Sequence, residues 1–189
     1  AVEAFKELGC AVEDAEISWT MEREYEAAIS GYKRDGEELD KSLTEEKKPL
    51  VSSHLRDIDA WEPGRGQMTV EAVNEVRAGM WATLSEIFGR CEVLLTPTTG
   101  TTQLAADIEL LKDEVVIEGN KVDSVMGWAL CWPFNMLERL PAISVPMGRA
   151  SNGVPLGLQI IGRPYDDLAV FRAAAAFEAA RPWTERPEL

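Results

Sequence analysis

The sequence predicts an α/β protein, in which helices and strands alternate along the chain. The first observation is a helical pattern between Thr69 and Gly89, where hydrophobic residues recur every three or four positions. The second is a pair of apolar runs, residues 142–145 and 156–161, each ended by proline and glycine. The turn sequence Ser-Asn-Gly at residues 151–153 separates them, so two buried strands joined by a tight turn are expected.

The composition is that of an ordinary globular protein. Of 189 residues, 46% are hydrophobic and 28% are charged, so disorder over most of the chain is not expected. With 33 acidic and 19 basic residues, the formal net charge is −14. Such a surface repels a nucleic-acid backbone or an anionic membrane, so we expect neither as a direct partner.

The chain carries no signal for membrane insertion or secretion. No apolar stretch approaches the roughly 20 residues that a membrane helix needs. Cys10, Cys91 and Cys131 are odd in number and far apart, which favours reduced thiols and a cytoplasmic setting. The chain opens on Ala1, without an initiator methionine and within a helical pattern, so we expect its true start to lie earlier.

The first third of the chain is predicted to be mainly helical. Residues 2–9 form the end of an amphipathic helix closed by a glycine, and residues 11–17 a short strand. Thr20 is the expected N-cap of an acidic helix that runs toward Gly31 or Gly36. The remaining expectations here are a helical stretch over residues 49–60 and a loop over residues 61–66.

The clearest helix lies between Thr69 and Gly89. Thr69 supplies an N-cap oxygen, and Gly89 ends the hydrophobic pattern. The residues expected to face the core are Val73, Val76, Met80, Leu84 and Ile87.

A short strand and a polar loop follow this helix. Residues 92–95 form an apolar strand that ends at Thr96 and Pro97. The run of hydroxyl side chains over residues 98–102 is expected as a loop. Ligands tend to bind at strand ends of α/β sheets, although a Thr/Gly loop is more often only a loop.

A hairpin and an aromatic helix are expected next. Residues 114–117 and 121–125 should pair, with Gly119 and Asn120 supplying positive φ angles. Residues 127–134 are aromatic and largely apolar, which predicts a buried helix. Cys131 lies within it, where a thiol is usually a small inert hydrophobe, and the surrounding aromatic residues form either core or the wall of a hydrophobic pocket.

The last helix is expected to begin at Asp166 or Asp167, either of which can cap it. It should stop before Pro182, which cannot continue a helix. The residues expected to pack inward are Leu168, Phe171, Ala175 and Phe177.

Two residue patterns resemble catalytic sets but lack the necessary partners. Ser30 and Lys33 fit the S-x-x-K pattern of serine acylases, yet no companion motif is present and their neighbours resemble a solvated helix end. His54 is the single histidine, and residues next to it on one helix point in different directions, which argues against a local triad. The other members of that apparent triad are Ser52, Ser53, Asp57 and Asp59.

Cofactor and metal sites also lack support. Gly64-Arg65-Gly66 does not follow a strand and lacks the third glycine of a dinucleotide fingerprint. One histidine and three scattered cysteines are too few ligands for a zinc site. We therefore expect no cofactor and no metal.

The stretch Trp132–Gly148, continued by Gly153–Pro164, resembles the C-terminal end of the amidase signature family. Many family members have a glycine where this chain has Glu138-Arg139, which suggests a particular amidase subgroup rather than a tRNA-dependent amidotransferase subunit. Other stretches similar to the family are Leu94–Thr98, Val116–Gly119 with Val122-Asp123, Pro164–Asp167 with the helix after it, and the opening helix-Gly-strand.

The resemblance implies the C-terminal part of the amidase signature fold, a mixed β-sheet flanked by helices. It implies hydrolysis of a carboxamide C–N bond by two serines and a lysine, all upstream of this chain, so this chain alone is expected to be inactive. The residues that the resemblance nominates as lining the substrate pocket are Thr98, Thr99, Cys131, Phe134 and Asn135.

These expectations describe one domain and a small set of partners. Residues 1–189 should be the C-terminal portion of a single amidase domain, with 1–90 mostly helical and 91–189 containing the sheet strands and terminal helix. The partners are a small-molecule amide, the missing N-terminal half, and a second copy if the enzyme is a homodimer. The alternatives are part of a glutamyl-tRNA amidotransferase A-type subunit and a stand-alone non-catalytic binding module.

Overall fold

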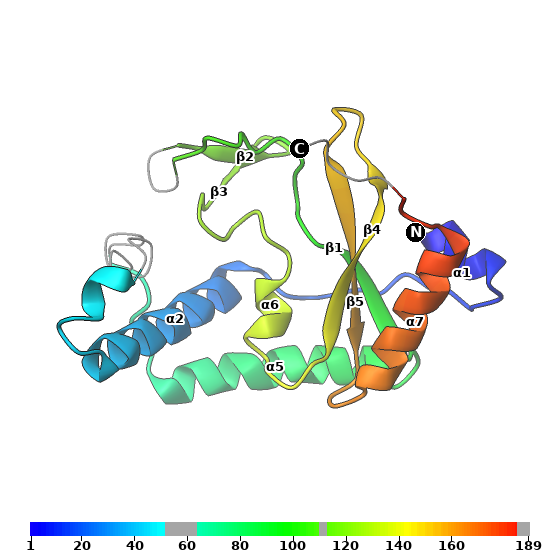
Figure 1. The fold of residues 1–189 in the computed structure, drawn as a ribbon. Coiled ribbons are helices and arrows are strands. Elements are labelled where there is room, and N and C mark those ends of the chain that lie inside the picture. Colours follow the sequence, from blue (N-terminus) through cyan, green and yellow to red (C-terminus); the bar gives the residue numbers. More distant parts are fainter. Residues whose placement is uncertain (52–63, 110–112, 185–189) are drawn as a thin grey trace. The chain divides into compact units, whose positions relative to one another are not determined.

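The computed structural model describes residues 1–51, 64–109 and 113–184 (Figure 1). These residues form two compact units. The first unit consists of Ala1–Ile17 and Leu84–Leu189, and the second of Ser18–Thr83. Helices and strands are both present, so the predicted α/β class is confirmed.

A three-stranded antiparallel sheet forms the centre of the first unit. Its strands are β1 (Val93–Pro97), β4 (Ala142–Arg149) and β5 (Pro155–Gly162), in the order β1-β5-β4. The predicted strand pair is confirmed, but β4 runs through Pro146 and Gly148 instead of stopping there. The register shifts between these two residues, which indicates a bulge on a strand that lies at the edge of the described sheet. An edge position tolerates proline because one side of the strand needs no ladder hydrogen bonds.

Helix α7 (Asp167–Ala180) packs on one face of this sheet (Figure 1). Asp166 caps it as predicted, since its side chain accepts a hydrogen bond from the Ala169 N–H at 3.2 Å. The shared core also includes helix α1 (Val2–Glu7), whose Phe5 stacks on Phe177 with ring centroids 5.7 Å apart. The buried residues of this core are Ala4, Phe5, Val145, Leu158, Ile160, Val170, Ala174 and Phe177.

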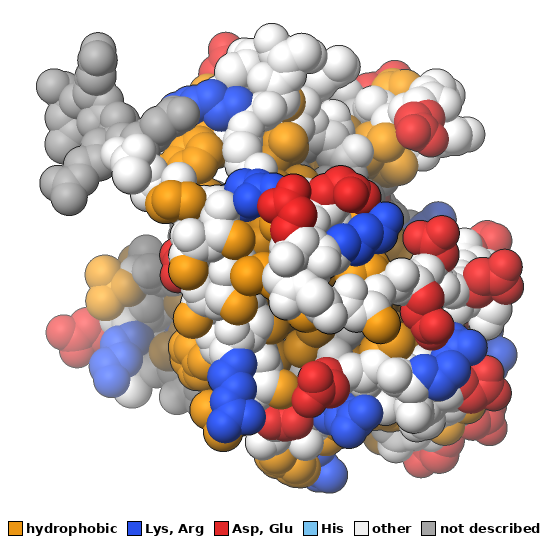
Figure 2. All heavy atoms as spheres, turned by 90° about the vertical axis from the view of Figure 1, so that its right-hand side faces the viewer, with side chains coloured by type: hydrophobic (Ala, Val, Ile, Leu, Met, Phe, Trp, Pro, Cys, Tyr) orange, Lys and Arg blue, Asp and Glu red, His pale blue; other side chains and the backbone are white. Residues whose placement is uncertain are grey.

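The predicted inward face of α7 is wrong except for Phe177. Leu168 is 57% exposed and Phe171 62% exposed, and Ala175 is exposed as well. The buried positions are Val170, Ala174 and Phe177. The helix is so rich in apolar residues that either of two faces could pack inward. Contact with the sheet determines which face does. In the view toward α7, hydrophobic side chains lie among acidic and basic ones (Figure 2).

Helix α5 (Val70–Phe88) confirms the clearest prediction. The Thr69 hydroxyl accepts a hydrogen bond from the Ala72 N–H at 3.2 Å, as an N-cap should. The five residues expected to face the core, Val73, Val76, Met80, Leu84 and Ile87, are all buried.

The hairpin β2 (Val115–Ile117) and β3 (Asn120–Val122) also forms as predicted, with one error in its turn. Positive φ angles occur at Glu118 and Gly119, not at Asn120. Ile117 pairs with Asn120, so the two residues between them must turn the chain. A two-residue turn of this kind needs positive φ at both central positions.

Two other expected elements are absent from the described structure of the first unit. Residues 127–134 do not form a continuous helix: a turn precedes the short helix α6 (Trp132–Asn135). Asp123 closes that turn by accepting hydrogen bonds from the N–H groups of Val125 and Met126, and Pro133 fits only in the first turn of a helix. Residues 11–17 form no strand, because the described sheet pairs only β1, β5 and β4.

The second unit contains helix α2 (Glu22–Ser42) and a short 3-10 helix, Lys48–Leu50. Helix α2 passes through both Gly31 and Gly36, where an end was expected, since a glycine within a helix costs only about 1 kcal/mol. Met21, not Thr20, is its N-cap. The expected helix over residues 49–60 and the expected loop over 61–66 lie largely outside the described residues.

Residues 1–51, 64–109 and 113–184 include no helix that is both long and apolar enough to cross a bilayer.

Candidate functional site

The face of the sheet opposite α7 carries a row of polar side chains. Leu158 and Ile160 of β5 belong to the core shared with α7, so Gln159, which lies between them, points to the other face. The register places Thr96 of β1 and Ser144 of β4 on either side of Gln159. All three side chains can donate or accept hydrogen bonds.

Ser144 also forms a hydrogen-bonded pair with Thr98, next to this row. The hydroxyl oxygens of Thr98 and Ser144 are 2.8 Å apart, which is hydrogen-bonding distance. Gly157 lies beneath this pair: a Cβ atom there would meet the Thr98 oxygen at 2.6 Å and the Ser144 oxygen at 2.7 Å. The absence of a side chain at residue 157 therefore permits the contact.

Backbone hydrogen bonds connect residues 128–130 to the polar loop after β1. The Gly100 N–H donates to the carbonyl of Trp128 at 2.8 Å, and the Leu130 N–H donates to the carbonyl of Thr98 at 3.0 Å. Thr99 and Ala129 form an antiparallel bridge between these two bonds. The loop containing Thr98 and Thr99 is thus held beside the residue that precedes Cys131.

Gln159 adds a side-chain link to the same segment. It is 4% exposed, and its Nε2 donates to the Thr96 hydroxyl at 2.9 Å and to the carbonyl of Leu130 at 3.3 Å. A backbone carbonyl can only accept, so the amide nitrogen must face Leu130. One side chain therefore connects β5, β1 and the residues leading into α6.

The nominated pocket residues differ in accessibility. Thr98 and Thr99 are half-buried, Phe134 is buried in α6, and Asn135 is exposed at the end of that helix. The expectation that Cys131 is a buried hydrophobe is wrong, since its thiol is exposed at the N-cap of α6. The short α6 buries Trp132, Pro133 and Phe134 and leaves the cap residue outside.

Three residues of this arrangement were not predicted: Ser144, Gly157 and Gln159. A polar residue inside the apolar run of residues 156–161 was a usable signal, because such a side chain must find hydrogen-bond partners when buried. The partners themselves were not predictable. Their identity depends on the register of β5 with both neighbours, which the sequence does not specify.

Ser30 and Lys33 are buried in the second unit, which contradicts the expected solvated helix end. Ser30 is 0% exposed, donates to the Glu26 carbonyl at 2.8 Å and accepts from the Met68 N–H at 3.0 Å. Lys33 is 9% exposed and donates to the carbonyl of Arg65 at 3.0 Å. These side chains anchor residues 65–68 on α2. A hydroxyl that is fully buried and bonded in both directions is not an accessible nucleophile.

The remaining sequence patterns add no further chemistry to the described residues. Within residues 1–51, 64–109 and 113–184, no group of three or more His, Cys, Asp or Glu side chains is arranged to hold a metal ion. The apparent triad around His54 lies outside the described residues.

Comparison with known proteins identifies the family. The family model described as Amidase matches residues 13–171. The chain belongs to the amidase signature family. The fold supports this assignment, because the chain superimposes on the crystal structure of a bacterial aryl acylamidase of the amidase signature family with a TM-score of 0.71. That match has 27% sequence identity and covers 99% of this chain and 41% of the other.

Two curated relatives illustrate the range of the family. An acylamidase of Rhodococcus erythropolis is 31% identical over 192 residues, which cover 98% of this chain. The A-type subunit of the glutamyl-tRNA(Gln) amidotransferase of Granulibacter bethesdensis is 41% identical over 115 residues, which cover 61% of this chain. The alignments span 38% of the acylamidase and 21% of the amidotransferase protein.

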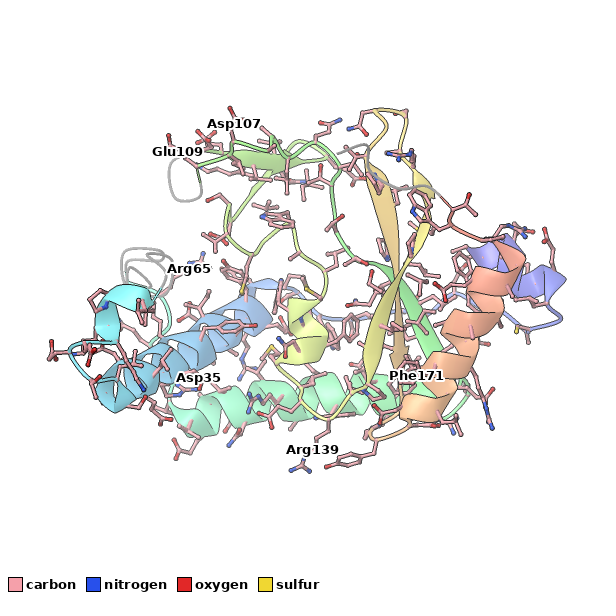
Figure 3. The ribbon with its side chains drawn as sticks, in the orientation of Figure 1. Asp35, Arg65, Asp107, Glu109, Arg139 and Phe171 are labelled. Atoms are coloured by element: carbon pink, nitrogen blue, oxygen red, sulfur yellow. The ribbon has the colours of Figure 1, made fainter. Side chains whose placement is uncertain are left out.

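Glu138 and Arg139, the pair expected to differ from many family members, have an unusual backbone conformation. Both adopt a φ of 58°. That left-handed region favours glycine, so the turn is formed here at a steric cost. The Arg139 carbonyl accepts a hydrogen bond from the Tyr165 N–H at 3.1 Å, and its side chain projects outward from the turn (Figure 3).

Proposed function

We propose that the protein containing this chain is an amidase that hydrolyses a carboxamide C–N bond. The chain is the C-terminal portion of its single amidase domain. The observation that carries this proposal is the acylamidase relative, which is 31% identical over 98% of the chain. The fold match to an aryl acylamidase over 99% of the chain supports it.

The proposed chemistry is nucleophilic catalysis by two serines and a lysine. One serine hydroxyl adds to the amide carbonyl carbon, and backbone N–H groups bind the oxyanion. The C–N bond then breaks, and the amine leaves with a proton relayed by the lysine and the second serine. Water cleaves the resulting ester, which releases a carboxylic acid and regenerates the serine. These residues lie in the part of the enzyme that precedes this chain.

The proposed contribution of this chain is one wall of the substrate site. Thr98 and Thr99 contribute from the loop after β1, and Cys131, Phe134 and Asn135 contribute from α6 and its N-cap. The hydrogen bonds between residues 98–100 and 128–130 support this assignment, because they keep the two stretches together. The ligand is a small-molecule amide, and no cofactor takes part. The chain alone should be inactive, because a binding wall without a nucleophile supplies no chemistry.

A second candidate is part of a glutamyl-tRNA amidotransferase A-type subunit. It is favoured by the higher identity to the amidotransferase relative, 41% over 115 residues. Another A-type subunit, that of Rhodospirillum rubrum, is 30% identical over 93% of the chain, close to the 31% over 98% of the acylamidase, so alignment coverage does not separate the two candidates and the enzyme assay must. An amidotransferase component would require a protein partner and would hydrolyse glutamine, whereas an acylamidase would act without another protein, as monomer or homodimer in the cytoplasm.

The test is amide hydrolysis by the complete protein, measured as arylamine release from an anilide and as ammonia release from glutamine. A fluorophosphonate probe should label one serine outside residues 1–189. Anilide cleavage without a partner supports the proposal, and glutamine cleavage that needs a second protein supports the amidotransferase. Labelling of Ser30, or no cleavage and no labelling, would contradict both. The last result would favour a non-catalytic binding module.

A further inference from the structure

We propose that Gln159 is a positioning residue that holds residues 128–135 on the sheet and thereby sets the affinity for the substrate. The proposal rests on the proposed function, because it takes these residues as part of the substrate site. Gln159 itself belongs to the strand layer beneath them. It acts through the carbonyl group of Leu130, so no contact between Gln159 and the substrate is required.

The burial of Gln159 is unfavourable unless its carboxamide is hydrogen-bonded. Its neighbours along β5, Leu158, Ile160 and Ile161, are buried and apolar. Among the described residues of the first unit, Gln159 is the only buried polar side chain. A leucine or isoleucine would satisfy the core at this point without any partner. The presence of a carboxamide is therefore explained by the two groups that it binds.

Those two groups belong to different parts of the candidate site. One hydrogen of Nε2 goes to the Thr96 hydroxyl at 2.9 Å, and the other goes to the Leu130 carbonyl at 3.3 Å. Leu130 is bound from its other side as well, since its N–H donates to the carbonyl of Thr98 at 3.0 Å. Gln159 and Thr98 thus restrain both polar groups of the backbone at Leu130.

The restraint is important because α6 is only four residues long. A helix of one turn has few internal hydrogen bonds and depends on its flanking contacts for its position. Leu130 immediately precedes Cys131, the N-cap of α6, and Phe134 and Asn135 follow within the helix. Loss of the Gln159 bond should therefore loosen the wall that these residues form. The residues proposed to carry out the chemistry lie elsewhere, so substrate binding should suffer more than turnover.

The experiment compares variants of the complete enzyme. Gln159→Met keeps the approximate length of the side chain and removes both hydrogen bonds, and should raise KM for the amide about tenfold with kcat changed less than about twofold. Thr96→Val removes the other partner of the carboxamide but leaves the Leu130 bond, so its effect should be smaller. Ile160→Val is the matched control, because Ile160 lies on the opposite face of β5 and packs with α7.

A second readout does not depend on activity. Alkylation of Cys131, followed by peptide mass spectrometry, should be faster in Gln159→Met than in the wild type. Cys10 is exposed in the same unit and serves as the internal reference. Ile160→Val should leave the ratio of Cys131 to Cys10 labelling unchanged, because it does not touch the Leu130 carbonyl.

Gln159→Glu provides a chemical test of the hydrogen bond. A carboxyl group can donate to the Leu130 carbonyl only when it is protonated. The KM defect, relative to the wild type at the same pH, should therefore shrink as the pH is lowered, whereas the defect of Gln159→Met should not. A buried carboxylate is costly in its ionised form in any case. The Gln159→Glu profile is therefore read together with the Cys131 labelling ratio of the same variant, which reports the position of residues 128–135 directly.

Three results would overturn the inference: an unchanged KM in a folded, active Gln159→Met enzyme, an equal rise of KM in Ile160→Val, or equal Cys131 labelling in all variants. The failure of the proposed function is distinguishable from these, since the wild-type enzyme would then hydrolyse no amide. In that case the labelling ratio alone decides whether Gln159 holds residues 128–135.

Discussion

The hydroxyl groups of Thr98 and Ser144 form a hydrogen bond across β5, with their oxygens 2.8 Å apart. Thr98 follows β1 and Ser144 lies in β4, so the pair connects the two strands that flank β5. Gly157 of β5 lies directly beneath the pair. The hydrogen bond can form because residue 157 is a glycine and leaves room for both hydroxyl groups.

Gly157→Ala should therefore destabilise the protein. The added methyl group would lie 2.6 Å and 2.7 Å from the two oxygens, closer than side-chain contacts allow. Either the hydroxyl pair separates or the strands shift, and we expect a loss of about 1–3 kcal/mol in the free energy of unfolding. Urea denaturation of the variant and the wild type measures the difference. A gain in stability would show that the sheet accommodates the methyl group.

Gly79→Ala should have the opposite effect. Gly79 lies within α5, its φ is not positive, and a Cβ atom there would meet no atom within 4 Å apart from its own stretch of helix backbone. Alanine loses less conformational freedom than glycine when a helix forms, so we expect a gain of about 0.5–1 kcal/mol. The same denaturation experiment checks it. A loss of stability would show that another part of the protein contacts this position.

Arg139→Gly should maintain or raise stability, by up to about 1 kcal/mol, although it removes a charged side chain. Arg139 holds a φ of 58°, which is costly for any residue with a Cβ atom and free of strain for glycine. Arg139→Ala is the matched control, because it removes the same side chain but keeps the Cβ atom. Thermal unfolding should place the glycine variant above the alanine variant. The reverse order would mean that the arginine side chain, rather than the backbone, determines the stability of this turn.

Phe177→Ala should destabilise the protein far more than Phe171→Ala, because one residue lies on the buried face of α7 and the other on its exposed face. Phe177 is buried against Phe5 in the core, so its truncation should cost about 3–5 kcal/mol. Phe171 is exposed, and its truncation should change stability by less than about 0.5 kcal/mol. Chemical denaturation of both variants makes the comparison. A large loss for Phe171→Ala would indicate that another part of the protein covers this face.

Glu71→Gln should reduce the acid sensitivity of the fold. The backbone N–H of Glu71 and the Thr69 hydroxyl hydrogen-bond to its carboxylate and hold its pKa below the usual value. A lowered pKa means that the folded state favours the ionised form. The contribution is therefore complete above the unfolded-state pKa and is lost as the pH falls through the folded-state pKa.

The wild type should accordingly be more stable than Glu71→Gln at neutral pH, and the two should converge in acid. Thermal unfolding across this pH range tests the prediction, with Glu86→Gln, an exposed carboxylate on the same helix, as the control. A stability difference that stays constant with pH would show that Glu71 contributes through something other than its charge.

Elements with a strong local pattern could be predicted from the sequence. Helix α5 has a capping threonine and five hydrophobic residues at helical spacing, and all five are buried. The β4–β5 pair has a turn sequence between two apolar runs, and the structure joins them in one antiparallel ladder. In both cases the decisive interactions connect residues close together in the sequence, so the pattern contains the information.

The wrong predictions concern features that depend on contacts between residues far apart in the sequence. Helix α7 has hydrophobic residues on more than one face, and only its packing on β4 and β5 selects Val170 over Phe171 as a core residue. The expected strand over residues 11–17 does not form, because a strand needs a partner to supply its backbone hydrogen bonds.

The sequence by itself determined the α/β class and the family, and it nominated the loop after β1 and the segment around α6 for the substrate site. Only the tertiary structure decided how those stretches meet: that Gln159 binds the Leu130 carbonyl, that Thr98 reaches Ser144 over Gly157, and that Cys131 is exposed. The physical reason is the range of the interactions. Helix periodicity and turn chemistry act over a few residues, whereas these contacts depend on strand register and on the packing of α6, which involve residues far apart in the chain.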